Sequence, residues 1–296
     1  MAEGLDGTFA GTFPFEARHL DANGVRLHYV DEGPGDGATF LFLHGNPTWS
    51  YLWRRQIAEL SAEGHRCVAY DHMGFGRSDK PPHLSAYSLR AHIDNALAVI
   101  DGLELRDVVL VMHDWGGPIG LGAALERPAM LRGAALMNTW AWELPSFLPP
   151  FIREFRSEGL GEILALGGNL FVESIPGGMA SRTVDETMME AYRAPFPNYW
   201  SRVGPLAFQR EIPITERDRS AALIGSISDR LPELGVPVLL LWGMRDPVFQ
   251  PMFLDQWREL FPQADVVEIY DASHYLIEDR PESVTEGLRR FGAGPG

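Results

Sequence analysis

The feature that most constrains the fold is a regular alternation of short apolar segments with longer segments of helical periodicity. Strand-length apolar runs occur at residues 26–30, 39–43, 67–70, 108–112, 133–137, 238–242 and 266–269. Helical patterns occur at residues 89–101, 118–126, 251–260 and 282–291. Strands that alternate with helices are joined mainly by parallel crossovers. The sequence therefore predicts an α/β fold with a mostly parallel central sheet flanked by helices.

This alternation is interrupted between residues 139 and 215, where proline, glycine and aromatic residues are concentrated. The clearest clusters are residues 140–145, 148–151 and 194–200. Proline suits helix starts and turns, but it removes a hydrogen-bond donor from a central strand. We therefore predict a core formed by residues 1–138 and 216–296, with residues 139–215 inserted as a helical cap over the sheet.

Composition argues against several classes of partner. The 296 residues include 40 Asp and Glu against 25 Lys and Arg, and the net charge of −15 opposes binding to nucleic acid or anionic membranes. No apolar run has membrane-spanning length, and the first residues lack a signal-peptide pattern. We therefore expect a cytoplasmic protein. Cys67 is the only cysteine, so no internal disulfide or cysteine-rich metal cluster forms, and we assign it no role.

Residues 111–118 follow an apolar run and begin a helical pattern, which is typical of a nucleophile elbow. In such a turn the nucleophile has a strained backbone, and small residues after it allow close packing. Asp114 occupies the nucleophile position, and Gly116 and Gly117 are the small residues. An ionised carboxylate attacks an sp³ carbon without a base and leaves an alkyl ester. Halide suits this reaction because it departs without a proton, whereas an epoxide oxygen needs an acid.

Polar residues after two other strand runs are expected at the same edge of the sheet. Asn46 offers amide N–H donors and Trp115 offers an indole N–H, so the two side chains can hold an anion such as halide. Their backbone N–H groups are suited to an oxyanion hole during ester hydrolysis. His274 follows the last strand run, where the order nucleophile, acid, histidine puts the base that activates water.

Three carboxylates are candidates to orient His274. Asp246 directly follows a strand run, which places it at the carboxyl edge of the sheet. Glu143 lies within the predicted cap, and Asp271 shares a loop with His274. We therefore predict that Asp246 is the orienting acid.

Taken together, these motifs resemble those of haloalkane dehalogenases of the α/β-hydrolase superfamily. The resembling segments span nearly the whole chain and are residues 44–50, 71–79, 113–117, 192–197, 242–246 and 273–274. The resemblance implies Asp114 as nucleophile, His274 as base and Asp246 as catalytic acid, with Asn46 and Trp115 as the halide-binding pair. It also implies a small halogenated alkane and water as substrates, an alcohol and halide as products, and no cofactor or metal.

The chain departs from the better-known patterns of that family at two positions. Some members have a glutamate where this chain has Asn138, and others have a glutamate in place of Asn46. The combination of Asn46 with Asp246 resembles the third subfamily. A contribution of Trp140 or Trp142 to halide binding stays open.

Two other functions are compatible with the same scaffold. Epoxide hydrolases share the fold and an aspartate nucleophile, but they need cap tyrosines to protonate the ring oxygen. Tyr192 and Tyr199 are the candidates in the predicted cap. A non-catalytic small-molecule receptor would have no need for a nucleophile, a base, an acid and two anion donors together. The full set of motifs therefore favours dehalogenation.

Overall fold

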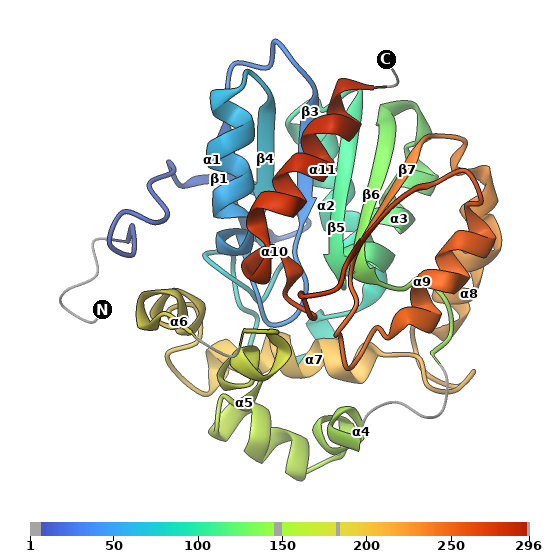
Figure 1. The fold of residues 1–296 in the computed structure, drawn as a ribbon. Coiled ribbons are helices and arrows are strands. Elements are labelled where there is room, and N and C mark those ends of the chain that lie inside the picture. Colours follow the sequence, from blue (N-terminus) through green and yellow to red (C-terminus); the bar gives the residue numbers. More distant parts are fainter. Residues whose placement is uncertain (1–6, 145–149, 182–183, 295–296) are drawn as a thin grey trace.

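A computed structural model describes residues 7–144, 150–181 and 184–294. Among these residues, an eight-stranded sheet forms the centre of the molecule, in the order β1-β2-β4-β3-β5-β6-β7-β8 (Figure 1). The strands are β1 (Arg18–Ala22), β2 (Val25–Glu32), β3 (Thr39–Leu43), β4 (Arg66–Tyr70), β5 (Val108–Asp114), β6 (Leu131–Thr139), β7 (Val238–Gly243) and β8 (Asp265–Ile269). Pairing is parallel from β4 through β8 and antiparallel for β1 and β2. The predicted α/β class is confirmed.

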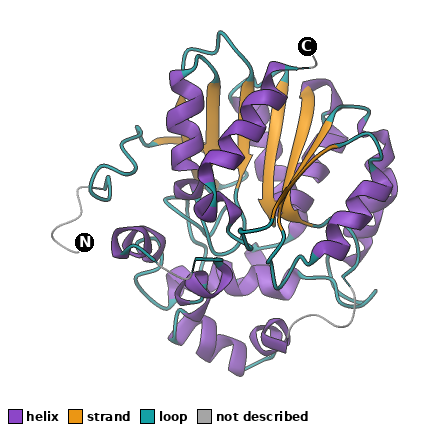
Figure 2. Cartoon of the chain, in the orientation of Figure 1, coloured by secondary structure: helices purple, strands orange, loops and turns teal. Residues whose placement is uncertain are grey.

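Helices pack on both faces of the sheet, as Figure 2 shows. On one face, α1 (Arg54–Ala62) contacts α11 (Pro281–Ala293). On the other face, α2 (Leu89–Gly102) contacts α3 (Gly116–Glu126), and α3 also contacts α8 (Ala221–Arg230). A further helix, α9 (Pro251–Leu260), contacts β7. Because both faces are covered, β5 is buried along its whole length, as is usual for a parallel sheet.

Each predicted strand and helix lies within an observed element, but β1, α1, α8 and the short helix at Leu276–Asp279 were not predicted. The edge strand β1 pairs only with β2 and carries mostly exposed side chains, so it lacks an apolar pattern. A turn joins the two strands at Asn23 and Gly24, which have φ of 51° and 80°. An Asn-Gly pair with positive φ is a strong hairpin signal, and it would have revealed β1.

A helical segment lies between β6 and α8 in the chain. Its described elements are α4 (Pro150–Arg156), η4 (Glu162–Gly167), α5 (Leu170–Glu173), η5 (Ile175–Gly178), α6 (Glu186–Arg193), η6 (Trp200–Arg202) and α7 (Val203–Glu211). Helices α4 to α7 lie together below the sheet in Figure 1. We call residues 150–211 the helical insertion. The domain boundaries at 138/139 and 215/216 stay a prediction, and residues 145–149 and 182–183 lie outside the described residues.

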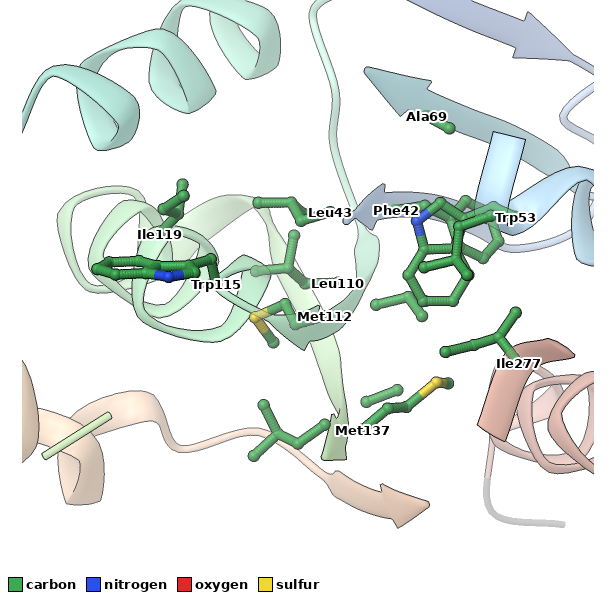
Figure 3. Packing of buried hydrophobic residues seen from close by; sticks show 14 of the residues in the cluster. Phe42, Leu43, Trp53, Ala69, Leu110, Met112, Trp115, Ile119, Met137 and Ile277 are labelled. Carbon is green, nitrogen blue, oxygen red and sulfur yellow. The ribbon is translucent and has the colours of Figure 1, made fainter. Parts of the chain in front are cut away.

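The start of α3 packs very closely on the sheet. Figure 3 shows Leu43 and Met112, from neighbouring strands, beside Trp115 and Ile119. A Cβ atom added to Gly116 would lie 2.2 Å from the carbonyl oxygen of Leu43. Because backbone atoms fill this space, only glycine lets the first turn of α3 approach β3 so closely.

This packing gives a matched pair of glycine substitutions in two helices. Gly116→Ala forces α3 away from β3, and we expect the free energy of unfolding to fall by about 2 kcal/mol or more. Gly225→Ala, in α8, meets open space. It should raise the free energy of unfolding by about 1 kcal/mol, because alanine favours helix more than glycine does. Urea denaturation of both variants tests this. Equal effects would show that close packing at Gly116 does not set the position of α3.

Candidate active site

Asp114 lies at the junction between β5 and α3, where the sequence predicts a nucleophile elbow. Its φ is 50°, a left-handed conformation that few residues other than glycine, asparagine and aspartate adopt readily. The loop after β3 passes directly beside it, since a Cβ atom on Gly45 would lie 2.3 Å from the Asp114 Cβ. The strained turn and the glycine loop therefore put the carboxyl ends of β3 and β5 in contact.

One oxygen of the Asp114 carboxylate is held by the backbone. Its Oδ1 accepts a hydrogen bond from the N–H of Asn46 at 2.8 Å, and the N–H of Trp115 also donates to the carboxylate. The residue is only 8% exposed. Burial raises the pKa of Asp114 to about 6, although the nearby His274 charge and these two backbone hydrogen bonds act in the opposite direction. The carboxylate is thus ionised at neutral pH but poorly solvated.

His274 and Asp246 form a buried pair. The Nδ1 atom of His274 lies 2.8 Å from Oδ2 of Asp246. Asn138 donates to the same Oδ2 at 2.9 Å, and the N–H of Val248 donates to Oδ1 at 2.7 Å. Burial alone would raise the pKa of Asp246, but the His274 charge and these hydrogen bonds lower it below its usual value. Asp246 is therefore an anion held in one orientation against the histidine ring.

The loop that carries His274 is fixed from a second direction. His113 donates from Nε2 to the carbonyl oxygen of His274 at 2.8 Å. Burial lowers the pKa of His274, but the charges of Asp246 and Asp114 outweigh it and raise the pKa above its ordinary value. Sequence analysis did not single out His113 or Asn138 as supporting residues. Only the comparison with family members that have a glutamate in place of Asn138 pointed to this position.

The carboxylate and the histidine line one cavity of about 280 Å³. Asn46 and Trp115 line it as well, so the structure brings all the predicted site residues except the buried Asp246 to its wall. The other lining residues are Pro47, Trp140, Leu144, Phe151, Ile152, Phe155, Phe171, Ser174, Gly177, Gly178, Gln209, Ile212, Pro247, Val248, Phe249 and Tyr275. The cavity is therefore apolar except around the reacting groups and at a few further side chains.

The side chain of Asn46 also contacts the helical insertion. Its Nδ2 donates to the carbonyl oxygen of Pro205 in α7 at 3.1 Å. An amide nitrogen has two hydrogens, so this bond leaves one N–H for a group in the cavity. The insertion therefore sets the direction of the Asn46 amide.

The two tryptophans near Asn138 have different surroundings. Trp140 lines the cavity between Trp115 and Phe249, with ring centroids 4.9 Å and 5.4 Å away. Trp142 packs on Trp257 with ring centroids 4.7 Å apart and does not line the cavity. Of the two, Trp140 is the one in contact with the site.

Several alternative candidates are placed away from the reacting groups. Glu143 is exposed, and Asp271 forms an exposed ion pair with Arg280. Tyr199 is 43% exposed. Tyr192 donates its hydroxyl to Glu278 at 2.5 Å and does not line the cavity. Neither Glu143 nor Asp271 contacts His274, and neither tyrosine lies in position to protonate an epoxide.

Glu278 belongs to a buried ion pair of the core, and it accepts a hydrogen bond from Tyr192 of the helical insertion. Arg54 of α1 donates to both oxygens of Glu278, at 2.6 and 2.8 Å. Glu278 lies in α10 (Leu276–Asp279), directly after the His274 loop, and Tyr192 lies in α6. The adjacent Asp279 accepts hydrogen bonds from the N–H groups of Ser273 and Ala180. The insertion and the His274 loop are thus held by the same short helix.

Three further features concern metal clusters, membrane-spanning helices and the single cysteine. In the part of the chain that the structure describes, no cluster of His, Cys, Asp and Glu is arranged to hold a metal ion. None of its helices has the length and apolar character needed to cross a membrane. Cys67 is buried in β4, and burial raises the pKa of its thiol.

A family model described as the Alpha/beta hydrolase family matches residues 40–286. The chain belongs to the alpha/beta hydrolase family. Among its relatives is a haloalkane dehalogenase 2 from Mycobacterium bovis, 35% identical, with 95% of this chain and 96% of that protein covered. A cis-3-alkyl-4-alkyloxetan-2-one decarboxylase from Shewanella oneidensis is 37% identical over 94% of this chain and 88% of that protein.

Solved structures of family members have the same fold. A haloalkane dehalogenase from Bradyrhizobium elkani superposes with a TM-score of 0.87 at 32% identity, covering 95% of this chain and 98% of the other. The resemblance to haloalkane dehalogenases that the motifs indicate is therefore confirmed, as is the α/β-hydrolase fold.

The raised pKa of Asp114 predicts a pH-dependent gain in stability for Asp114→Asn. Folding raises this pKa from 3.8 to about 6, so the ionised carboxylate destabilises the folded state by about 2–3 kcal/mol above pH 6. Asparagine tolerates positive φ and can still accept the Asn46 hydrogen bond. We expect the variant to be more stable than the wild type at pH 8. The difference should shrink as the pH falls from 6 towards 4.

Urea denaturation of both proteins at pH 8 and pH 4.5 measures this difference. A gain that is the same at both pH values would contradict a raised pKa at Asp114.

Proposed function

We propose that this protein hydrolyses haloalkanes to an alcohol and a halide through a covalent alkyl ester on Asp114. The observation that carries the proposal is the buried carboxylate on the cavity wall, with Oδ1 held by the N–H of Asn46 and the N–H of Trp115 also donating to the carboxylate. The held oxygen becomes the carbonyl of the ester, which leaves Oδ2 as the attacking atom. Relatives named haloalkane dehalogenase support this choice of substrate.

In the first step, Oδ2 of Asp114 attacks the carbon that carries the halogen. The carbon–oxygen bond forms as the carbon–halogen bond breaks, and the halide leaves with its electron pair. The free N–H of Asn46 and the indole N–H of Trp115 stabilise the charge that develops on the halogen. Donors that act only on this developing charge lower the barrier rather than merely binding substrate.

In the second step, His274 removes a proton from water, and the hydroxide attacks the ester carbonyl carbon of Asp114. The negative charge that forms on Oδ1 is stabilised by the N–H groups of Asn46 and Trp115. Asp246 stabilises the resulting histidinium. The bond between the carboxyl carbon and the alkoxide oxygen then breaks, His274 returns its proton to that oxygen, and the alcohol leaves. The restored carboxyl group of Asp114 ionises and releases one proton. The helical insertion, whose cavity-lining residues are mostly apolar, acts as a cap that keeps bulk water away from the first step.

A second candidate is decarboxylation of an oxetan-2-one, a four-membered lactone. Relatives with this named activity support it, one of them 37% identical to this chain. Here Oδ2 of Asp114 attacks the sp³ ring carbon bonded to oxygen, and the ring opens to a carboxylate. The carbon–carbon bond to that carboxylate then breaks and CO₂ leaves. The electron pair of the broken bond forms the alkene, and the bond to Oδ2 breaks to restore the Asp114 carboxylate. This sequence needs no water and no base.

The experiment that tests the proposal compares substrates directly. Wild-type enzyme is incubated with bromo-, chloro- and iodoalkanes, an epoxide, and a cis-3,4-dialkyloxetan-2-one, while halide, diol and CO₂ are measured. We expect halide release, faster from bromide and iodide than from chloride. Release of CO₂ with no halide from any alkane would favour the second candidate, and diol formation as the fastest reaction would contradict both.

His274→Phe separates the two half-reactions. Because displacement by Asp114 needs no base, we expect about one equivalent of halide per enzyme and then no further turnover. The alkyl ester should appear as a mass increase on the intact protein, and Asp114→Ala should give neither halide nor adduct. Lactone decarboxylation, in contrast, should continue in His274→Phe. Repeated halide turnover by this variant would remove His274 from the mechanism.

A further inference from the structure

A buried amide stands out on the wall of the cavity. Gln209 lies in α7, is 7% exposed, and lines the same cavity as Asp114. Its Oε1 atom is buried and has no hydrogen-bond partner among the described residues. Phe155 and Ile212, which also line the cavity, are apolar. The amide is therefore a polar group in a mostly apolar pocket, and the proposed dehalogenation does not use it.

An unpaired amide of this kind is unfavourable. Burying a polar group without a partner costs about 1–3 kcal/mol. A simple haloalkane cannot remove this penalty, because its carbon chain neither donates nor accepts hydrogen bonds. An amide presents N–H donors at Nε2 and an acceptor at Oε1. A substrate that carries an oxygen atom would pair with the Nε2 donors, and a hydroxyl group would also satisfy Oε1.

Helix α7, which carries this amide, also contacts both proposed halide donors. Gln209 lies one turn after Pro205, so the two residues share a helix face. The Pro205 carbonyl accepts the hydrogen bond from Asn46, and the ring of Phe208 lies 5.0 Å from that of Trp115. The Oδ1 atom of Asn46 is also buried without a partner among the described residues. The side-chain amides of Asn46 and Gln209, which both line the cavity, thus each have an unpaired oxygen atom.

The backbone of Gln209 is held firmly from the other side. Arg156 of α4 donates to the carbonyl oxygens of Gln209 and Arg210, at 3.0 and 3.2 Å. The same arginine forms an ion pair with Asp218 at 2.7 Å. These bonds fix the last turn of α7, so Gln209 presents its amide without reordering the helix.

We infer that Gln209 determines specificity, and that its side-chain amide hydrogen-bonds an oxygen atom of the substrate. The inference rests on the proposed function, in that the substrate reacts at Asp114. The preferred substrate carries an oxygen that accepts from Nε2, and a hydroxyl group would in addition donate to the unpaired Oε1. The accepting oxygen belongs either to an ether, hydroxyl or carbonyl group of an alkyl halide, or to the carboxyl group of a lactone.

The test compares isosteric substrates in wild type and Gln209→Met. The substrates are 1-bromopentane and two ethers of equal length, 1-bromo-2-ethoxyethane and 1-bromo-3-methoxypropane. We expect kcat/KM for at least one ether to fall about tenfold in the variant, the effect of one lost hydrogen bond. The value for 1-bromopentane should stay the same or rise. The ratio of kcat/KM for ether to kcat/KM for alkane is compared between the two enzymes. This comparison cancels the different intrinsic reactivity of the substrates.

Ser174→Ala is the matched control. Ser174 also lines the cavity, but its hydroxyl already donates to the carbonyl of Phe171 at 2.7 Å. Its removal should leave the ratio of ether to alkane turnover at the wild-type value. Thermal unfolding of both variants shows whether they are folded. A cis-3,4-dialkyloxetan-2-one forms the second arm, and a tenfold loss there alone would place the paired oxygen in the lactone.

Three outcomes would overturn the inference. They are equal losses on alkane and ether, unchanged values on all substrates, or a changed ratio in Ser174→Ala as large as in Gln209→Met. Failure of the proposed function is distinguishable, because the wild type would then release no halide. In that case the wild type binds the bromides without turnover, and titration of tryptophan fluorescence with 1-bromopentane and 1-bromo-2-ethoxyethane still tests Gln209. Weaker binding of only the ether in Gln209→Met is the expected result.

Discussion

The close approach of helix α3 to strand β3 is the constraint on which the site depends. Gly116 allows it, since the carbonyl oxygen of Leu43 occupies the space that a side chain would need. The chain must then turn sharply after β5, and Asp114 takes up positive φ at that turn. The same turn directs the N–H of Trp115, at the positive end of the α3 dipole, towards the carboxylate. Packing between two apolar elements thus creates the geometry of an anionic nucleophile.

The site buries charged groups that would each destabilise the folded protein if they were buried alone. Burial raises the pKa of Asp114, and burial alone would lower the pKa of His274. Each group stabilises the charged form of the other, and Asp246 adds a second negative charge beside the histidine ring. Asn138 and the N–H of Val248 keep that charge hydrogen-bonded. Such networks are stable only when all members are satisfied, which ties the reacting groups to the fold around them.

Much of the fold and of the site could be predicted from sequence. Apolar runs located β2 to β8, because strands buried on both faces have a strong local pattern. Asp114 and His274 could be placed together because residues that follow parallel strands meet at one edge of the sheet. Asn138 and Gln209 could not be found in this way, since the role of a buried amide depends on which distant groups it faces. The edge strand β1 has no apolar pattern, and only its turn gave a signal.

The ion pair between Arg54 and Glu278 has a consequence for exchanging parts between family members. Tyr192 of the helical insertion completes this pair, and α10, which carries Glu278, begins just after His274. The helical insertion could be replaced by that of another protein to change the pocket. If the new insertion lacked an equivalent of Tyr192, Glu278 would lose the hydrogen bond from the tyrosine hydroxyl. The histidine loop would then lose one of its anchors. The insertion and the His274 loop should therefore be exchanged together between family members, although they are far apart in the chain.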